Sequence, residues 1–221
     1  MQALRYVAVL AVAGIVVSAA LADSPREPKK KIVPAVQAKA KLVNVRLSDL
    51  PKAGWTAKPP SKSDDSSPRC SYYNPDQSDL TENGDADAPQ FTLASGSYIT
   101  STTGIFQTAP QGRTAYTRVV QPALPKCLGE IFRKGTGQAA NVTIVSAGPM
   151  KFPHLAERSN AYRIAADFKV QSNVVHVFVD VVVMNRGKVD VVVFFAGIGG
   201  SFNATVEQSV AAHVAARMAS V

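Results

Sequence analysis

Few residues of this sequence have the type and spacing that catalysis requires. The chain has three histidines, His154, His176 and His213. His176 and Asp180 share one face of a predicted strand, but about 13 Å separates them along it, which is too far for a hydrogen bond. No serine lies in the G-x-S-x-G pattern that exposes a nucleophile at a sharp turn. We therefore expect no enzyme. A hydrolase that uses His176 or His213 is the alternative, because catalytic triads assemble from residues distant in sequence.

The sequence also offers little for a metal or a cofactor. Acidic side chains crowd residues 76–87, but their spacing fits no EF-hand loop, and calcium needs six to eight converging oxygens. The glycine-rich residues 197–201 precede a predicted helix, yet they lack the lysine of a phosphate-binding loop. We expect no metal site and no cofactor.

The best candidate for binding is one face of the predicted sheet near the end of the chain. This face lies opposite a row of valines and mixes apolar with polar side chains, which is the usual composition of a ligand site. If helices cover it only partly, it forms a groove; if they cover it fully, it belongs to the core. The candidate residues are His176, Phe178, Asp180, Met184 and Phe194.

Alternating apolar and polar residues predict the strands that would carry this face. The pattern occurs over residues 142–145, 162–170, 175–184 and 189–195, and it predicts an antiparallel meander. For the last hairpin we expect a three-residue loop at 185–187. This loop would pair Val183 with Val189 and Val181 with Val191, and so keep every buried position apolar.

Helices are predicted on either side of this meander. Residues 112–134 are predicted to form two helices separated by Pro122 and Pro125, and a further helix is expected from Thr205 to Met218. Residues 42–47 favour a short strand, and residues 58–90 a long loop. The predicted fold class is α+β: a mainly antiparallel sheet flanked by helices.

The two cysteines, Cys70 and Cys127, predict one structural disulfide. Cys127 falls on the apolar face of the second predicted helix, so the bond would fasten the loop of residues 58–90 to the body of the domain. The sequence contains no CxxC redox motif, which favours a structural bond over a catalytic one.

The chain begins with a segment typical of export. Residues 1–22 combine a positive charge at Arg5, an uncharged run over residues 6–21 and an A-x-A cleavage pattern at residues 20–22. The alternative is an uncleaved anchor through residues 6–21, because basic residues follow closely. Either interpretation predicts a secreted or extracytoplasmic protein.

Most of the formal net charge of +8 lies near the N-terminus. Residues 23–41 carry six basic and two acidic side chains among prolines and alanines, which predicts a disordered tether ahead of a single α+β domain at residues 42–221. Residues 26–41 could therefore contact an anionic membrane surface. We expect no nucleic-acid partner, because the remaining domain is nearly neutral.

Several segments together resemble a known family. The chain contains LSDLPKAGW at residues 47–55, one cysteine soon after, a second in a predicted helix, and the hairpin VFVDVVVMNRGKVDVVVFF at residues 177–195. Over residues 42–219 it resembles actinobacterial secreted sensor-like domains, similar to the extracellular domain of the PknH kinase and to LpqN-type envelope proteins. The resemblance implies a PsbP-like fold, which in some members has a cleft for a ligand. Only the two cysteines match residue by residue, and the chain has neither a lipobox cysteine nor a kinase domain.

We therefore expect a monomeric, non-enzymatic binding or sensor-like domain of the bacterial cell envelope. Its partner would be a small apolar or amphiphilic ligand, a lipid or a cell-wall component. The alternative is a protein–protein interaction module that uses a sheet edge or the acidic loop.

Overall fold

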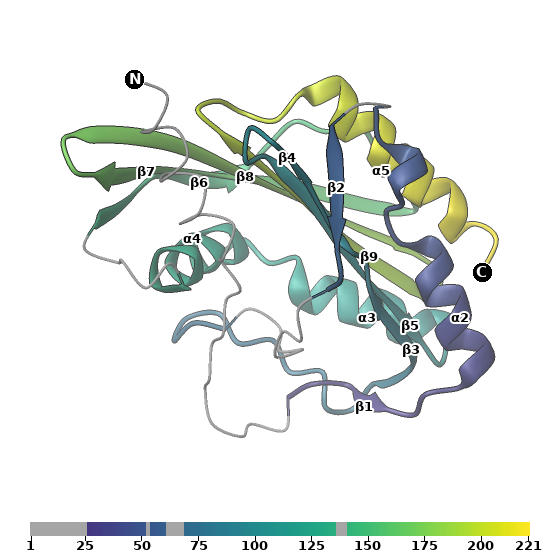
Figure 1. Cartoon of the computed structure of the whole chain (residues 1–221). Helices are drawn as coiled ribbons and strands as arrows, with labels where there is room; N and C mark the ends of the chain where they lie inside the picture. The colour runs from purple at the N-terminus through teal and green to yellow at the C-terminus, as the bar shows by residue number, and fades with distance from the viewer. Residues whose placement is uncertain (1–25, 52–53, 61–68, 136–140) are drawn as a thin grey trace.

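The computed structural model describes residues 26–51, 54–60, 69–135 and 141–221. They form a mostly antiparallel sheet of nine strands in the order β1-β3-β5-β9-β8-β7-β6, with β2 paired to β4 and β4 to β5 beside this path (Figure 1). The strands are β1 Lys29–Lys30, β2 Trp55–Lys58, β3 Thr81–Asp87, β4 Gln90–Leu93, β5 Tyr98–Phe106, β6 Val142–Pro149, β7 Arg158–Val170, β8 Asn173–Arg186 and β9 Val189–Ile198. The predicted export segment, residues 1–22, lies outside the described residues.

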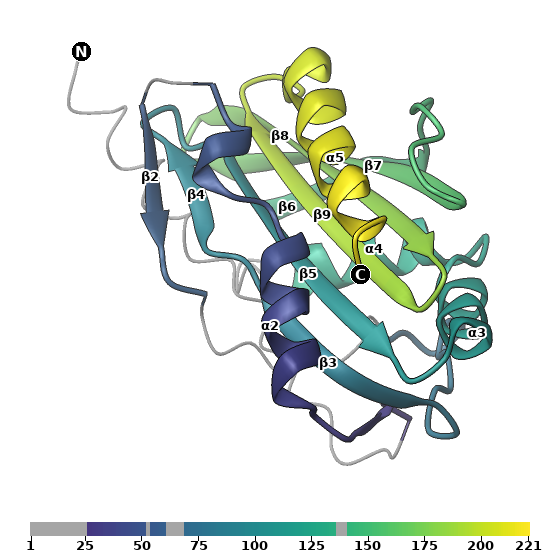
Figure 2. The ribbon, with the colours of Figure 1, turned by 90° about the vertical axis from the view of Figure 1, so that its right-hand side faces the viewer.

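Helices cover both faces of the sheet. One face carries α2 (Pro34–Val43) and α5 (Ala204–Met218), which lie toward the viewer in Figure 2. The other carries α3 (Ala109–Val119) and α4 (Leu124–Gly135), and a short 3-10 helix, η1 (Leu47–Asp49), follows α2. The predicted α+β class, the meander β6 to β9, the two helices within residues 112–134 and the final helix are confirmed.

A separate apolar cluster lies on each face of the sheet. On the α2/α5 side, Val182 and Phe195 pack against Val210 and Val214 of α5. On the α3/α4 side, the predicted row of valines packs against side chains of both helices, and its members are Val177, Val179, Val181 and Val183. The central strands therefore bury both sets of alternating side chains, as strands covered on two faces must.

The predicted three-residue loop between β8 and β9 is wrong. Arg186 pairs with Val189, so Gly187 and Lys188 alone make the turn, and Gly187 has a φ of +57° that favours glycine. Val183 then pairs with Val192 and not with Val189. This register places Asp190 on the same face as Val183.

A row of hydrogen-bonded polar side chains across three strands compensates for placing Asp190 on this face. Asn185 pairs with both Arg158 and Asp190 across the strands, and its amide donates to the Asp190 carboxylate at 2.6 Å. Arg158 in turn donates to the Asn185 oxygen at 3.2 Å. A three-residue loop would be needed only if apolar residues alone occupied this face, whereas here a hydrogen-bonded row completes it.

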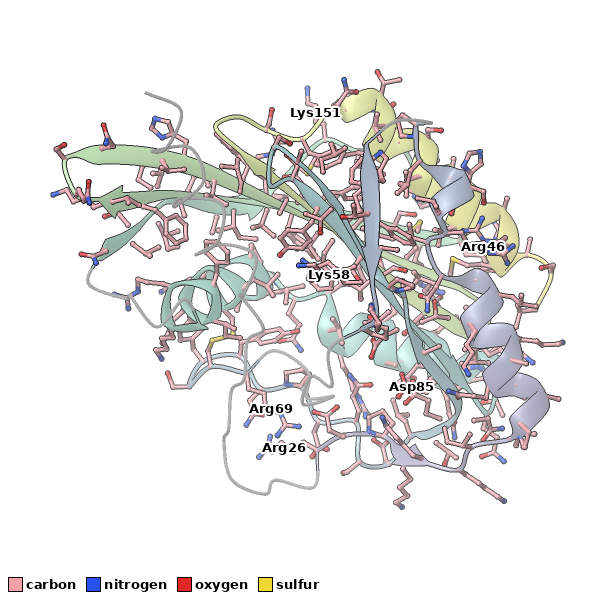
Figure 3. All side chains as sticks on the ribbon, viewed as in Figure 1. Arg26, Arg46, Lys58, Arg69, Asp85 and Lys151 are labelled. Atoms are coloured by element: carbon pink, nitrogen blue, oxygen red, sulfur yellow. A yellow bond between two sulfur atoms is a disulfide. The ribbon has the colours of Figure 1, made fainter. Side chains whose placement is uncertain are left out.

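Residues 26–41 are not the predicted disordered tether. Lys29 and Lys30 pair with β3, and α2 packs through Ala40 and Val43 into the same core as α5. Gln37 exchanges two hydrogen bonds with the backbone of Asp85 on β3. Figure 3 labels Asp85 beside α2. A helix held by polar contacts with a strand has only a narrow apolar stripe, so apolar periodicity did not reveal it.

The predicted strand over residues 42–47 and the unbroken loop over residues 58–90 are also wrong. Residues 42–43 end α2, and residue 47 begins η1. Within the described part of 58–90, β3 forms with strict alternation in burial, but its buried positions hold Glu82, Gly84 and Ala86. Such small or charged residues give no strand signal in a sequence.

The predicted disulfide is confirmed. Cys70 and Cys127 are bonded with their Cα atoms 5.7 Å apart, and Cys127 is fully buried on α4. Tyr73, three residues beyond Cys70, donates a hydrogen bond to the Val119 carbonyl at the end of α3. The bond and this tyrosine together hold residues 69–80 against the two helices.

We expect the double variant Cys70→Ser, Cys127→Ser to lose about 4 kcal/mol of unfolding free energy. The bond closes a separation of 57 residues and so restricts the unfolded chain. Urea denaturation followed by circular dichroism measures this loss, and reduction of the wild-type protein should reproduce it. Equal urea midpoints for the oxidised wild type and the variant would contradict it.

Asn44, just after α2, provides a second test of the fold. It donates to the Ala86 carbonyl at 2.8 Å and accepts from Ser101 and Thr103 at 2.9 and 2.7 Å, all in buried positions. We expect Asn44→Ala to cost about 2 kcal/mol, since it leaves buried hydroxyls without their acceptor. Leu42→Ala is the control, because Leu42 is 58% exposed. Equal denaturation midpoints for the two variants would show that α2 is not fastened through Asn44.

Candidate functional site

Helix α5 covers only part of its face of the sheet. The far end of the β7–β8 hairpin extends past α5 at the left of Figure 1, while α4 lies below it. Most apolar residues that point toward α4 there are buried, with Val170 and Val175 half-buried near the tip. The alternate residues are half-buried or exposed. We call this uncovered surface the open face; its residues are Arg163, Ala165, Asp167, Lys169, Val174, His176 and Phe178.

Arg163 and Asp180 form an ion pair at the border between the open face and α5. They are cross-strand neighbours, and the guanidinium donates from Nε and Nη2 to the two carboxylate oxygens, each at 2.6 Å. Asp180 is 1% exposed, whereas the Arg163 side chain is 33% exposed. The guanidinium also lies over the Phe178 ring, 6.0 Å from its centroid. Arg163 therefore presents a fixed positive group at the surface.

A second carboxyl group lies beneath this pair. Glu207, in the first turn of α5, is 1% exposed, and both of its oxygens lack a hydrogen-bond donor among the described residues when it is ionised. Burial, and then the neighbouring Asp180 carboxylate, raise the pKa of Glu207 to about 8. In its protonated form Glu207 donates a hydrogen bond to the Asp180 carboxylate, which Arg163 also contacts.

His176 is paired with an acidic residue on the open face. Its cross-strand neighbour is Asp167, and Nδ1 lies 2.7 Å from the carboxylate. The His176 side chain is 58% exposed and that of Asp167 is 35% exposed. Such a pair orients the imidazole toward solvent, where it can donate or accept a hydrogen bond through Nε2.

The structure brings together three of the predicted binding residues and separates the other two. His176, Phe178 and Asp180 follow one another along the same side of β8. Met184 lies on that side as well, but it is fully buried beneath α5. Phe194 pairs with Val181 and packs on the α3/α4 side, because the two-residue turn reverses the side that was predicted for it.

Sequence reasoning missed three residues of this site: Arg163, Asp167 and Glu207. The alternation along β7 already placed Arg163 and Asp167 on the polar side of that strand, and this was the signal available. Glu207 gave none, because an acidic residue in the first turn of a helix is ordinary. Its burial depends on how α5 sits on the sheet.

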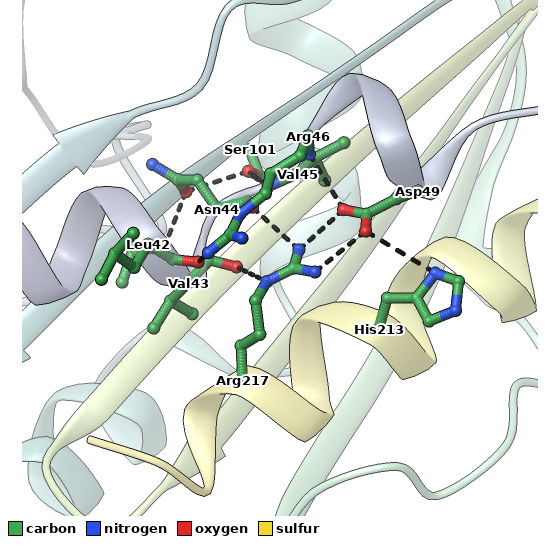
Figure 4. Close-up of polar contacts among 10 residues, drawn as sticks. Leu42, Val43, Asn44, Val45, Arg46, Asp49, Ser101, His213 and Arg217 are labelled. Atoms are coloured by element: carbon green, nitrogen blue, oxygen red, sulfur yellow. Dashed lines mark hydrogen bonds and ion pairs between the residues drawn. The ribbon is translucent and has the colours of Figure 1, made fainter.

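His213, the second histidine of the hydrolase alternative, belongs to a structural cluster. Figure 4 shows it beside Asp49, 3.7 Å from one carboxylate oxygen. The same carboxylate accepts two hydrogen bonds from Arg217, at 2.9 and 2.7 Å. Arg217 also donates to the carbonyls of Val43 and Asn44 at the end of α2. This cluster fastens α5 to α2 and η1, which is a structural role.

Neither a metal centre nor a membrane span is seen in the described ranges. Within them, no three or more His, Cys, Asp or Glu side chains are grouped so as to hold a metal ion. Likewise, none of the helices described there is long and apolar enough to cross a membrane.

Comparison with known proteins gives a distant structural likeness. No family model matches the sequence, and a search among curated proteins gives no match. Among solved structures, the crystal structure of the extracellular domain of PknH from Mycobacterium tuberculosis is similar over 89% of this chain and 100% of that chain, with a TM-score of 0.46 and 11% sequence identity. Of the predicted resemblance, the similarity to the PknH extracellular domain is confirmed, whereas no match supports the similarity to LpqN-type proteins or a PsbP-like fold. A likeness this distant carries no argument about function.

Two acidic residues with raised pKa values, Asp190 and Glu207, predict that stability falls as the pH rises. Burial raises the pKa of Asp190 to about 8, and the pKa of Glu207 also lies at about 8. The folded protein therefore keeps protons that the unfolded chain has already released above pH 4 to 5. Their stabilising contribution is complete below that range and is lost progressively up to about pH 8.

We expect the melting temperature to drop by several degrees between pH 5.5 and pH 8.5. The isosteric variant Glu207→Gln should reduce that drop, because its amide donates to Asp180 at every pH, and Asp190→Asn should reduce the remainder. Calorimetry across this range provides the measurement. An unchanged pH profile in Glu207→Gln would show that Glu207 is not protonated in the fold.

Proposed function

We propose that this protein is an extracytoplasmic, non-enzymatic binding domain that holds a component of the cell envelope against its open face. The observation that carries the proposal is the uncovered α5 side of the β7–β8 hairpin. There Phe178, His176 and Arg163 are accessible, although the same side of the sheet is buried a few residues further along β8. An accessible aromatic ring beside fixed polar groups is typical of a binding surface.

The disulfide supports the proposed location. Such bonds form and persist in oxidising compartments outside the cytoplasm. The proposed lack of catalysis rests on two observations. Among the described residues, no Ser, Thr or Cys side chain is hydrogen-bonded to the His176 imidazole, and His213 lies in the cluster that fastens α5.

The chemistry of the open face favours an amphiphilic ligand. Phe178 and Val174, the latter 48% exposed, supply apolar contact. Arg163 uses Nε and Nη2 for Asp180, which leaves Nη1 to meet an acidic group of the ligand. The surface is a sheet face and not a deep pocket, so an extended molecule fits it best. A partner protein on the same face is the alternative, because sheet surfaces of this kind also bind proteins.

Two probes test the proposal: laurate, an anionic amphiphile, and soluble muropeptides from the cell wall. We expect one of them to shift the backbone amide resonances of the open face in NMR titrations. Phe178→Asp should weaken that binding about tenfold, because it removes the ring and adds a repelling charge. Arg163 is left unchanged here, since its loss would strand two buried carboxyls.

Leu47→Asp is the matched control, since Leu47 is 54% exposed on η1, away from the open face. It should bind as the wild type does. If neither probe shifts the open face, or if Leu47→Asp weakens binding as much as Phe178→Asp, the proposed ligand class is wrong. Shifts caused only by a partner protein captured from the envelope fraction would favour the interaction module. The monomeric state and the contact of residues 26–41 with a membrane surface stay predictions.

A further inference from the structure

A second surface, on the opposite side of the sheet, has the composition of an anion site. An open depression of about 440 Å³ lies along the outer side of α3 and reaches the start of β7. Its lining residues are Pro110, Arg113, Thr114, Thr117, Arg118 and Arg158. Three arginines from two separate elements therefore line one depression, and none of the residues that line it is acidic.

Two of these arginines are held in place from outside the depression. Arg118 donates to both oxygens of Asp79 and, at 2.7 Å, to the carbonyl of Asp76. Arg158 donates one hydrogen bond to Asn185, which is itself fixed by Asp190. A guanidinium has five N–H donors, so both groups keep donors for a ligand. Because they are already oriented, a ligand would lose little affinity to their ordering.

The third arginine and two threonines complete the set. Arg113 and Thr117 are one turn apart on α3, as are Thr114 and Arg118, so these four side chains share one side of the helix. The Thr114 hydroxyl adds a neutral donor among the three positive charges, whereas the Thr117 hydroxyl already donates to the Arg113 carbonyl at 2.9 Å. This combination offers more donors and more charge than one carboxylate can use, whereas a phosphate group has enough oxygens to accept from all of them.

We propose that this depression binds the phosphate group of a ligand, with Arg113, Arg118 and Arg158 as its charged donors. Asp79 lowers the affinity of the site for phosphate, because its carboxylate competes with the phosphate for the Arg118 guanidinium. The site is separate from the open face and does not depend on the function proposed for that face.

Isothermal titration calorimetry with inorganic pyrophosphate at low ionic strength tests the site. Arg113→Gln is the preferred variant, because the structure gives Arg118 and Arg158 further contacts within the fold. We expect it to weaken binding about tenfold. Asp79→Asn should do the opposite and tighten binding several-fold, since it removes the competing charge while the Asp76 carbonyl and the new amide oxygen still orient the Arg118 guanidinium. Lys151→Ala, which removes a positive charge outside the depression, should leave the affinity unchanged.

A parallel flotation experiment with vesicles distinguishes a soluble phosphate ligand from a lipid headgroup. Phosphatidylglycerol vesicles that retain the wild type but not Arg113→Gln would identify a lipid source, and pyrophosphate binding without vesicle binding would identify a soluble one. The proposal is overturned if neither probe binds, or if Lys151→Ala weakens binding as much as Arg113→Gln. It is also overturned if Asp79→Asn fails to raise the affinity.

Discussion

The two-residue turn at Gly187 and Lys188 is the constraint on which the rest of the structure depends. It fixes the pairing of β8 with β9, and a slip of one residue would move every side chain of β9 to the other face. Helix α3 packs against this turn: a side chain at Gly112 would meet the Gly187 carbonyl oxygen at 2.7 Å. The turn thus sets the register and also provides a docking point for α3, the helix that carries Arg113 and Arg118.

That register imposes a cost, because it places Asp190 in a half-buried position next to Asn185 instead of leaving it in solvent. The row from Arg158 through Asn185 to Asp190 offsets the cost with hydrogen bonds. The same row positions Arg158 at the edge of the depression beside α3. The hydrogen-bonded row that permits this strand pairing therefore also places the Arg158 guanidinium where a ligand could reach it.

Sequence alone was sufficient for the parts of the fold that depend on apolar periodicity. It predicted the meander β6 to β9, helices α3 to α5, and the bond between Cys70 and Cys127. It failed where polar contacts decide the structure. Helix α2 is held through Gln37 and Asn44, and the β8–β9 register through Asn185. Of the site, it placed His176, Phe178 and Asp180 on one side of β8, but the burial of Glu207 required the three-dimensional position of α5.

The open face follows from the same placement of α5. The helix begins after Asn203, which caps it by accepting from the amides of Thr205 and Val206. Its first turn then sets Glu207 beside Asp180, so carboxyl groups and the Arg163 guanidinium occupy the border where an apolar helix surface would otherwise continue. Covering more of the hairpin would remove the Arg163 guanidinium from water, with the Asp180 carboxylate as its ion-pair partner. The desolvation of such a pair is costly. The polar border therefore limits how far the core can extend along β8, and Phe178 and His176 remain accessible beyond it.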